Sequence, residues 1–74
     1  MAQRMFAEIV ERFKDREGKT EWEVWILKEY SVPADGTPPK FRIVQICGNE
    51  FEIWDGDYPT HEAAKAAYRD SAGN

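Results

Sequence analysis

The 74-residue chain has a single cysteine, Cys47, and a single histidine, His61. One cysteine cannot form an internal disulfide, and a histidine without a cysteine at ligand spacing does not make a zinc site. This shortage indicates a reducing compartment. It also gives no reason to expect a metal ion or any other cofactor.

The sequence also lacks a long apolar run. Its first residues, MAQRMFAEIVERF, are interrupted by Arg4, Glu8 and Glu11 and so lack the apolar centre of a signal peptide. No run of apolar residues has the length of a membrane span. We therefore expect a cytoplasmic protein that makes no use of a membrane.

Motifs of catalysis are missing as well, since the chain has neither a phosphate-binding glycine loop nor a nucleophile elbow. Cys47 lies between Ile46 and Gly48, without a base beside it. The paired acids belong to predicted strands open to water, where carboxylates gain no special reactivity. These pairs are Glu21 with Glu23 and Glu50 with Glu52. We do not expect an enzyme.

Charge of one sign is not in large excess, because charged residues make up 32% of the chain and the net charge is -4. Basic residues gather at Lys14, Arg16 and Lys19, but Asp15 and Glu17 alternate with them and nearly cancel their charge. Nucleic acid is therefore not the expected partner.

Strand signals are strongest around Gly48-Asn49, a two-residue hairpin turn between the β-rich runs FRIVQIC and EFEIW. If the turn closes on Cys47 and Glu50, the pairing continues outward to Ile43 with Trp54. Period-two geometry then defines two apolar sets on opposite faces. One set is Val44, Ile46, Phe51 and Ile53, and the other is Phe41, Ile43 and Trp54.

A helix is predicted from Thr60, because Pro59 disfavours helix at Tyr58 and the threonine hydroxyl can cap the first turn. One side of this helix carries Ala64, Ala67, Tyr68 and Ser71. We expect Tyr68 to anchor that side against the Val44, Ile46, Phe51 and Ile53 set. Residues 71–74 are expected to form a frayed end.

In the first half of the chain, residues 5–13 fit two kinds of secondary structure. Residues 5–13 fit a helix through Met5, Phe6, Ile9, Val10 and Phe13, and they fit a strand with Met5, Ala7, Ile9 and Phe13 on one face. A turn at Gly18 before the strand-like segment 21–30 favours the strand, and the helix stays as the alternative. In segment 21–30 the inward side is Trp22, Val24 and Ile26, and a loop over 31–39 follows.

The sequence thus predicts one α+β domain over residues 1–74. Its core would be a three- to four-stranded antiparallel meander with a C-terminal helix packed on one face.

The segment GDYPTHEAAKAAY, residues 56–68, resembles the strand-to-helix segment of AP2-type DNA-binding domains and of the arm-binding domains of tyrosine integrases. The shared order is a glycine, an aromatic, a threonine, a glutamate and helical alanines. The resemblance implies a sheet with a helix on one face. In those families the other face binds the DNA major groove.

The function follows from the face that the helix leaves uncovered. We expect this face to be a protein-binding patch with an acidic border. Its predicted residues are Trp25, Leu27, Phe41, Ile43 and Trp54, bordered by Glu21, Glu23, Glu50 and Glu52.

The predicted partner is a protein with a basic surface, so the chain would act as a small inhibitor or regulator of a phage or mobile element. One alternative is a DNA-binding accessory factor of the integrase-arm or AP2 type, which would use Lys14, Arg16, Lys19, Lys40 and Arg42. Another is a structural homodimer joined through the tryptophan face.

Overall fold

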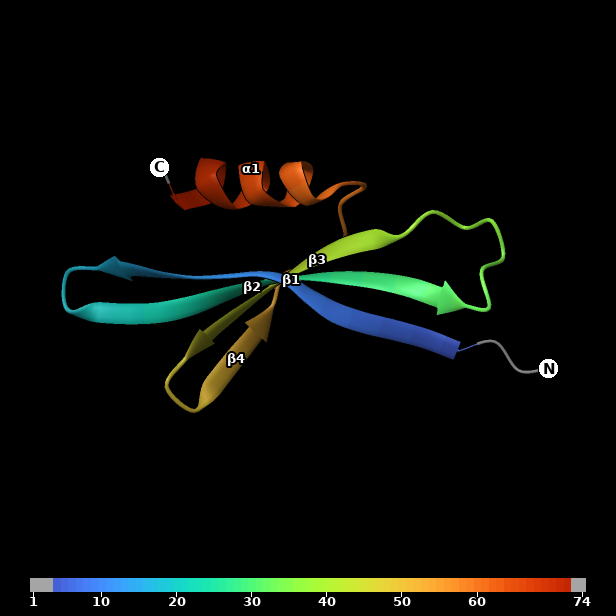
Figure 1. The fold of residues 1–74 in the computed structure, drawn as a ribbon. Helices are drawn as coiled ribbons and strands as arrows, with labels where there is room; N and C mark the ends of the chain where they lie inside the picture. The colour runs from blue at the N-terminus through green and yellow to red at the C-terminus, as the bar shows by residue number, and fades with distance from the viewer. Residues whose placement is uncertain (1–3, 73–74) are drawn as a thin grey trace.

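The computed structural model describes residues 4–72. Four strands form one antiparallel sheet in the order β1-β2-β3-β4, and one helix lies on one face of it (Figure 1). The elements are β1 (Arg4–Glu17), β2 (Thr20–Val32), β3 (Lys40–Cys47), β4 (Glu50–Ile53) and α1 (His61–Ala72). The predicted α+β meander with a C-terminal helix is confirmed.

The first strand, β1, takes in residues 5–13, so the strand alternative is correct for this segment. A β-bulge interrupts the pairing of β1 with β2 between Ile9 and Glu11. Because the extra residue, Val10, shifts the alternation by one, the two halves of β1 contribute their apolar side chains to different faces. Phe13 packs under α1. The prediction that it shares a face with Met5, Ala7 and Ile9 is wrong.

The hairpin of β3 and β4 has the predicted register. Ile46 pairs with Phe51 and Val44 with Ile53, and the Trp54 N–H donates to the Ile43 carbonyl at 3.0 Å. Gly48 has a φ of 63° at the first position of the turn. A positive φ there suits a type II′ turn, which matches the twist of the two strands.

The chain then crosses to the other face of the sheet. Gly56, with a φ of 81°, starts this turn, and Tyr58 exchanges two backbone hydrogen bonds of 2.8 Å with Phe41. The Thr60 hydroxyl accepts from the Ala63 N–H at 3.0 Å, which confirms Thr60 as the helix cap. Because α1 continues through Ala72, the frayed end does not begin at Ser71. Residues 73–74 lie outside the described part of the chain.

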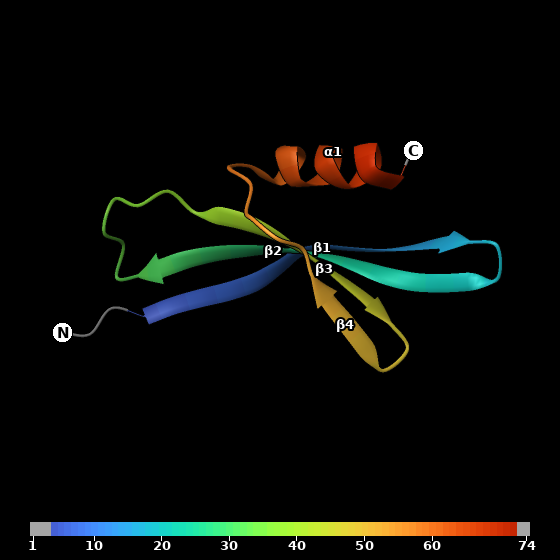
Figure 2. The ribbon, with the colours of Figure 1, turned by 180° about the vertical axis from the view of Figure 1, so that it is seen from behind.

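The core lies between α1 and the sheet. Val24, Ile26 and Ile43 are fully buried there, together with Ala64 and Tyr68 of the helix. Seen from either side, α1 covers the half of the sheet nearer the turn between β1 and β2, and the start of β1 and the loop 33–39 extend beyond it (Figures 1 and 2).

Tyr68 is the anchor of α1, as predicted, but it packs against a different set of residues from the expected one. Its ring lies 5.4 Å from Phe13 and 5.6 Å from Trp54, measured between ring centroids. The expected contact set is on the opposite face of the sheet. Two of its members, Phe51 and Ile53, are 68% and 50% exposed.

Candidate functional site

The face of the sheet away from α1, here called the free face, lacks three of the five apolar residues of the predicted patch. Trp25 and Leu27 lie on it, as expected from the inward direction of Val24 and Ile26. Phe41, Ile43 and Trp54 lie on the helix side instead, where Ile43 is fully buried. For these three residues the predicted face is wrong.

The pairing of β2 with β3 explains this correction. Ile43 lies directly opposite Ile26, and Val44 lies opposite Trp25. Residues opposite each other in an antiparallel pair point to the same face. The Ile43 side of the hairpin therefore joins the core of β2, and the Val44 side joins Trp25.

An apolar stripe crosses the free face from the start of β1 to β4. Its exposed members include Met5 at 68%, Ile9 at 44% and Phe51 at 68% of full exposure. We define the apolar stripe as Met5, Ala7, Ile9, Trp25, Leu27, Val44, Ile46, Phe51 and Ile53. All four strands contribute to it, so it is one continuous surface rather than scattered side chains.

The stripe is hollowed. An open depression of about 510 Å³ lies between β1 and the hairpin of β3 and β4. Most of its lining belongs to the apolar stripe, and the turn residues Gly48, Asn49 and Glu50 close one end. Val44 at its floor is only 7% exposed. The depression can therefore receive a convex apolar element.

Basic side chains stand on both sides of the stripe, and we call them the basic flanks. On β1 they are Arg12, opposite Trp25, and Lys14, opposite Glu23. On β3 they are Lys40 and Arg42, opposite Glu29 and Leu27. The Arg42 Nε lies 3.0 Å from a Glu29 oxygen, and the Lys40 Nζ lies 3.7 Å from Asp57.

Of the four residues predicted for the acidic border, Glu21 and Glu23 lie on this face beside Trp25, and Glu50 and Glu52 do not. Glu23 accepts a hydrogen bond from the Trp25 indole, and Glu21 lies opposite Arg16. Glu52 lies opposite Gln45, on the helix side of the hairpin, and Glu50 lies at the turn. The free face also carries Glu29, so its flanks are mixed, with basic side chains in excess over Glu21, Glu23 and Glu29.

On the helix side, Glu11 ties β1 to the start of α1. Its two oxygens lie 2.6 Å from the His61 Nε2 and 3.0 Å from the Lys65 Nζ. The hydrogen bonds from Lys65 and His61 hold the pKa of Glu11 below its ordinary value. His61 is half-buried and belongs to this structural contact.

We expect Glu11→Gln to weaken the dependence of the free energy of unfolding on pH in the acidic range. The pKa of the Glu11 carboxyl is lower in the folded state than in the unfolded state, where glutamate has a pKa of about 4.3. Such a carboxyl stabilises the fold at pH values above the unfolded pKa. This contribution is lost as the pH falls through the folded pKa. Urea midpoints of the native protein should therefore drop more steeply below about pH 5 than those of Glu11→Gln. Glu8→Gln, an exposed change on the same strand, is the control. Parallel curves for the native protein and Glu11→Gln would contradict this role.

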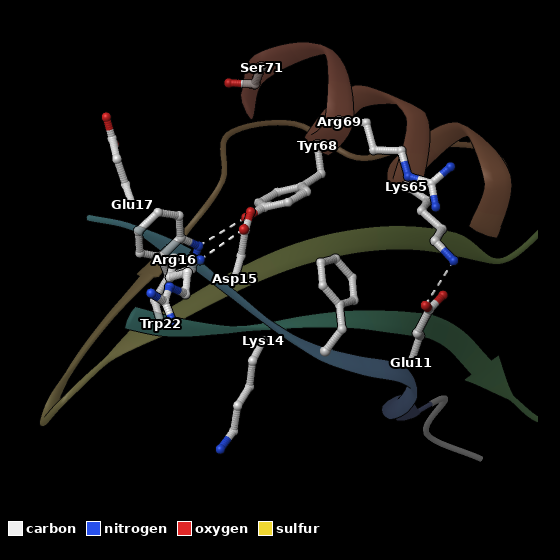
Figure 3. A pocket seen from close by; sticks show the side chains of 11 residues that line it. Glu11, Lys14, Asp15, Arg16, Glu17, Trp22, Lys65, Tyr68, Arg69 and Ser71 are labelled. Atoms are coloured by element: carbon white, nitrogen blue, oxygen red, sulfur yellow. Dashed lines mark hydrogen bonds and ion pairs between the residues drawn. The ribbon is translucent and has the colours of Figure 1, made fainter. Parts of the chain in front are cut away.

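A second hollow, of about 830 Å³, lies between α1 and the hairpin of β1 and β2 (Figure 3). At its floor the Tyr68 hydroxyl donates to Asp15 at 2.5 Å and accepts from the Trp22 indole at 2.9 Å. The bonds from Tyr68 and the Arg16 backbone N–H lower the pKa of Asp15. Burial, with the Asp15 carboxylate nearby, raises the pKa of Tyr68. These polar atoms satisfy one another.

Within residues 4–72, no group of three or more histidine, cysteine or acidic residues could hold a metal ion. Over the same residues, no helix is long and apolar enough to cross a membrane. Cys47 is exposed at the end of β3.

No protein-family model, curated protein or solved structure matches this chain. The resemblance of residues 56–68 to AP2-type and integrase-arm domains stays a prediction.

Proposed function

We propose that the protein is a non-catalytic protein-binding module of the cytoplasm that uses the free face. The observation that carries this proposal is the apolar stripe, whose residues come from all four strands and whose two ends, on β1 and β4, are exposed. Monomeric proteins rarely expose a continuous apolar patch of this kind unless it is covered in a complex.

The size of the core supports the proposal. Apart from Val44 on the free face, the buried apolar residues found in the described chain are Val24, Ile26, Ile43, Ala64 and Tyr68. The chain exposes 5693 Å², against about 4,700 Å² for a compact monomer of 8.6 kDa.

A small regulator or inhibitor from a phage or mobile element is the setting we propose for such a module. A basic target surface is less well supported, because that expectation depended on an acidic border and the glutamates on the free face are outnumbered by the basic residues beside them. The complementary surface would be apolar at its centre and acidic at its edges.

DNA binding is a second candidate, and one observation favours it. Lys14, Lys40 and Arg42 share the free face with Trp25, as basic and aromatic residues share the DNA-binding face in the families that residues 56–68 resemble. Aliphatic side chains occupy the centre of this face, however, where groups that read base edges would be needed. Protein binding is the better-supported function.

A photo-crosslinking residue tests the proposal. We expect benzoylphenylalanine in place of Phe51 to form adducts with a protein partner in the native cell. The same replacement of Phe6, an exposed phenylalanine on the other face, is the matched control and should not form them. Adducts with nucleic acid at position 51 would favour the second candidate. Equal yields at both positions would contradict a specific role for the free face.

A further inference from the structure

The shape and charge of the free face identify the kind of partner, and this inference rests on the proposed function. We propose that the free face binds an amphipathic α-helix of a partner protein. The apolar side of that helix would fill the depression, and acidic residues on both its edges would meet the basic flanks.

The shape of the face points to a helix. The depression lies between β1 and the hairpin of β3 and β4 and is lined mostly by apolar side chains. A convex cylinder about 10 Å across fills such a hollow, whereas a second flat sheet would leave it empty. The molecule already shows this packing on its other face, where α1 lies on the sheet through Ala64 and Tyr68.

The charges select an acidic helix. Arg12 and Lys14 are exposed and form no ion pair with the described residues. Lys40 is 57% exposed beside Asp57 at 3.7 Å, a contact that leaves its ammonium accessible. These side chains stand on opposite sides of the apolar stripe. A helix with acidic residues on both edges would therefore meet a basic group on each side.

A second copy of the chain fits the same face poorly. A two-fold axis along the stripe would bring the β1 flank of one copy onto the β3 flank of the other, and an axis across the stripe would bring each flank onto its own equivalent. Each flank also carries a glutamate, Glu23 or Glu29, but in both cases flanks with an excess of basic residues would face each other. The apolar side of α1 is already used in the core, so a second copy cannot supply the helix either.

The test uses two synthetic helical peptides of about 18 residues, a length at which isolated helices become stable enough to study. Both carry leucines at i, i+3, i+4 and i+7 spacing, with glutamates beside the leucines in one and lysines in the other. We expect the acidic peptide to bind at least tenfold more tightly, measured by fluorescence anisotropy of a labelled peptide.

A charge reversal makes the test specific. In the double variant Lys14→Glu with Lys40→Glu we expect the preference to reverse toward the lysine peptide. The control, Lys19→Glu with Arg69→Glu, makes the same change of net charge at exposed positions away from the stripe and should keep the preference of the native protein. A reversal in both variants, or in neither, would overturn the proposal.

Other outcomes also count against it. If both peptides bind equally and the Phe51→Ser change abolishes the binding of both, the proposal of an acidic helix is overturned, while the free face remains a protein-binding surface. Failure of both peptides would overturn the helix, and only a failure of the crosslinks at position 51 would end the proposed function. If sedimentation shows a dimer that the Phe51→Ser change dissociates, the occupant of the free face is a second copy of the chain. If the protein binds duplex DNA in a salt-sensitive way and Lys14→Glu with Lys40→Glu abolishes that binding, the occupant is DNA.

Discussion

Replacing Tyr68 with alanine is expected to unfold the protein or nearly so. The Tyr68 ring is 5% exposed and packs between Phe13 and Trp54, so its loss leaves a cavity between α1 and the sheet. Truncating a buried aromatic costs about 3–5 kcal/mol, and small domains have only about 5–15 kcal/mol in total. Thermal unfolding followed by far-ultraviolet circular dichroism measures the effect.

The Tyr68→Phe variant distinguishes the contribution of the ring to stability from that of the hydroxyl. This variant keeps the packing but removes the partner of the Trp22 indole and of Asp15, and we expect a loss of about 1–3 kcal/mol. The helix should remain. A melting temperature of Tyr68→Ala within a degree or two of the native value would show that α1 does not pack on the sheet through this residue.

The two tryptophans Trp25 and Trp54 should respond very differently to replacement by alanine. Trp54 contacts the Tyr68 ring and donates its indole N–H to Gln45 at 3.1 Å. Its loss should approach the roughly 3–5 kcal/mol of a core tryptophan. Trp25 lines the open depression, and its loss should cost about 1 kcal/mol, the ordinary effect of a point mutation.

Urea unfolding of the two single variants checks this difference. Trp25→Ala should keep its circular dichroism spectrum and lose partner binding, because tryptophans at the centre of an interface commonly contribute about 2 kcal/mol or more. Equal destabilisation by the two changes would mean that both faces of the sheet are core. Trp25 would then have no special place in binding.

Features set by neighbouring residues could be predicted from the sequence. The turn at Gly48 determines the register of β3 against β4, and Thr60 determines where α1 begins. Both signals depend on local backbone chemistry that the residue types reveal directly.

The face covered by α1 could not be predicted in the same way. Both sides of the β3–β4 hairpin are apolar, so alternation alone does not say which one is inside. The choice depends on Ile26 lying opposite Ile43, a pairing across a loop whose length sets no register. The positions of Phe41, Ile43 and Trp54, three of the five apolar residues predicted for the site, follow from this single contact.

The sequence groups Lys14, Lys40 and Arg42 only as an alternative DNA-binding set, and their place on the two sides of the apolar stripe could not be predicted. Arg12 and Lys14 are distant in sequence from Lys40 and Arg42, and they frame one stripe only after β2 has paired with both neighbours. Glu11 reaches His61 and Lys65 because the bulge at Val10 places it on the helix side. The residue types in this segment do not predict a bulge.

The bulge at Val10 also separates two kinds of mutational tolerance within one strand. Before it, Met5, Ala7 and Ile9 point to the free face; after it, Phe13 and Asp15 support α1. Under the proposed function, substitutions at positions 5, 7 and 9 are expected to alter partner binding more than folding. After the bulge, changes at Phe13 and Asp15 are expected to alter folding, whereas Arg12 and Lys14 lie on the free face among the basic flanks. A library confined to positions 5, 7 and 9 would therefore explore new specificities on a constant scaffold.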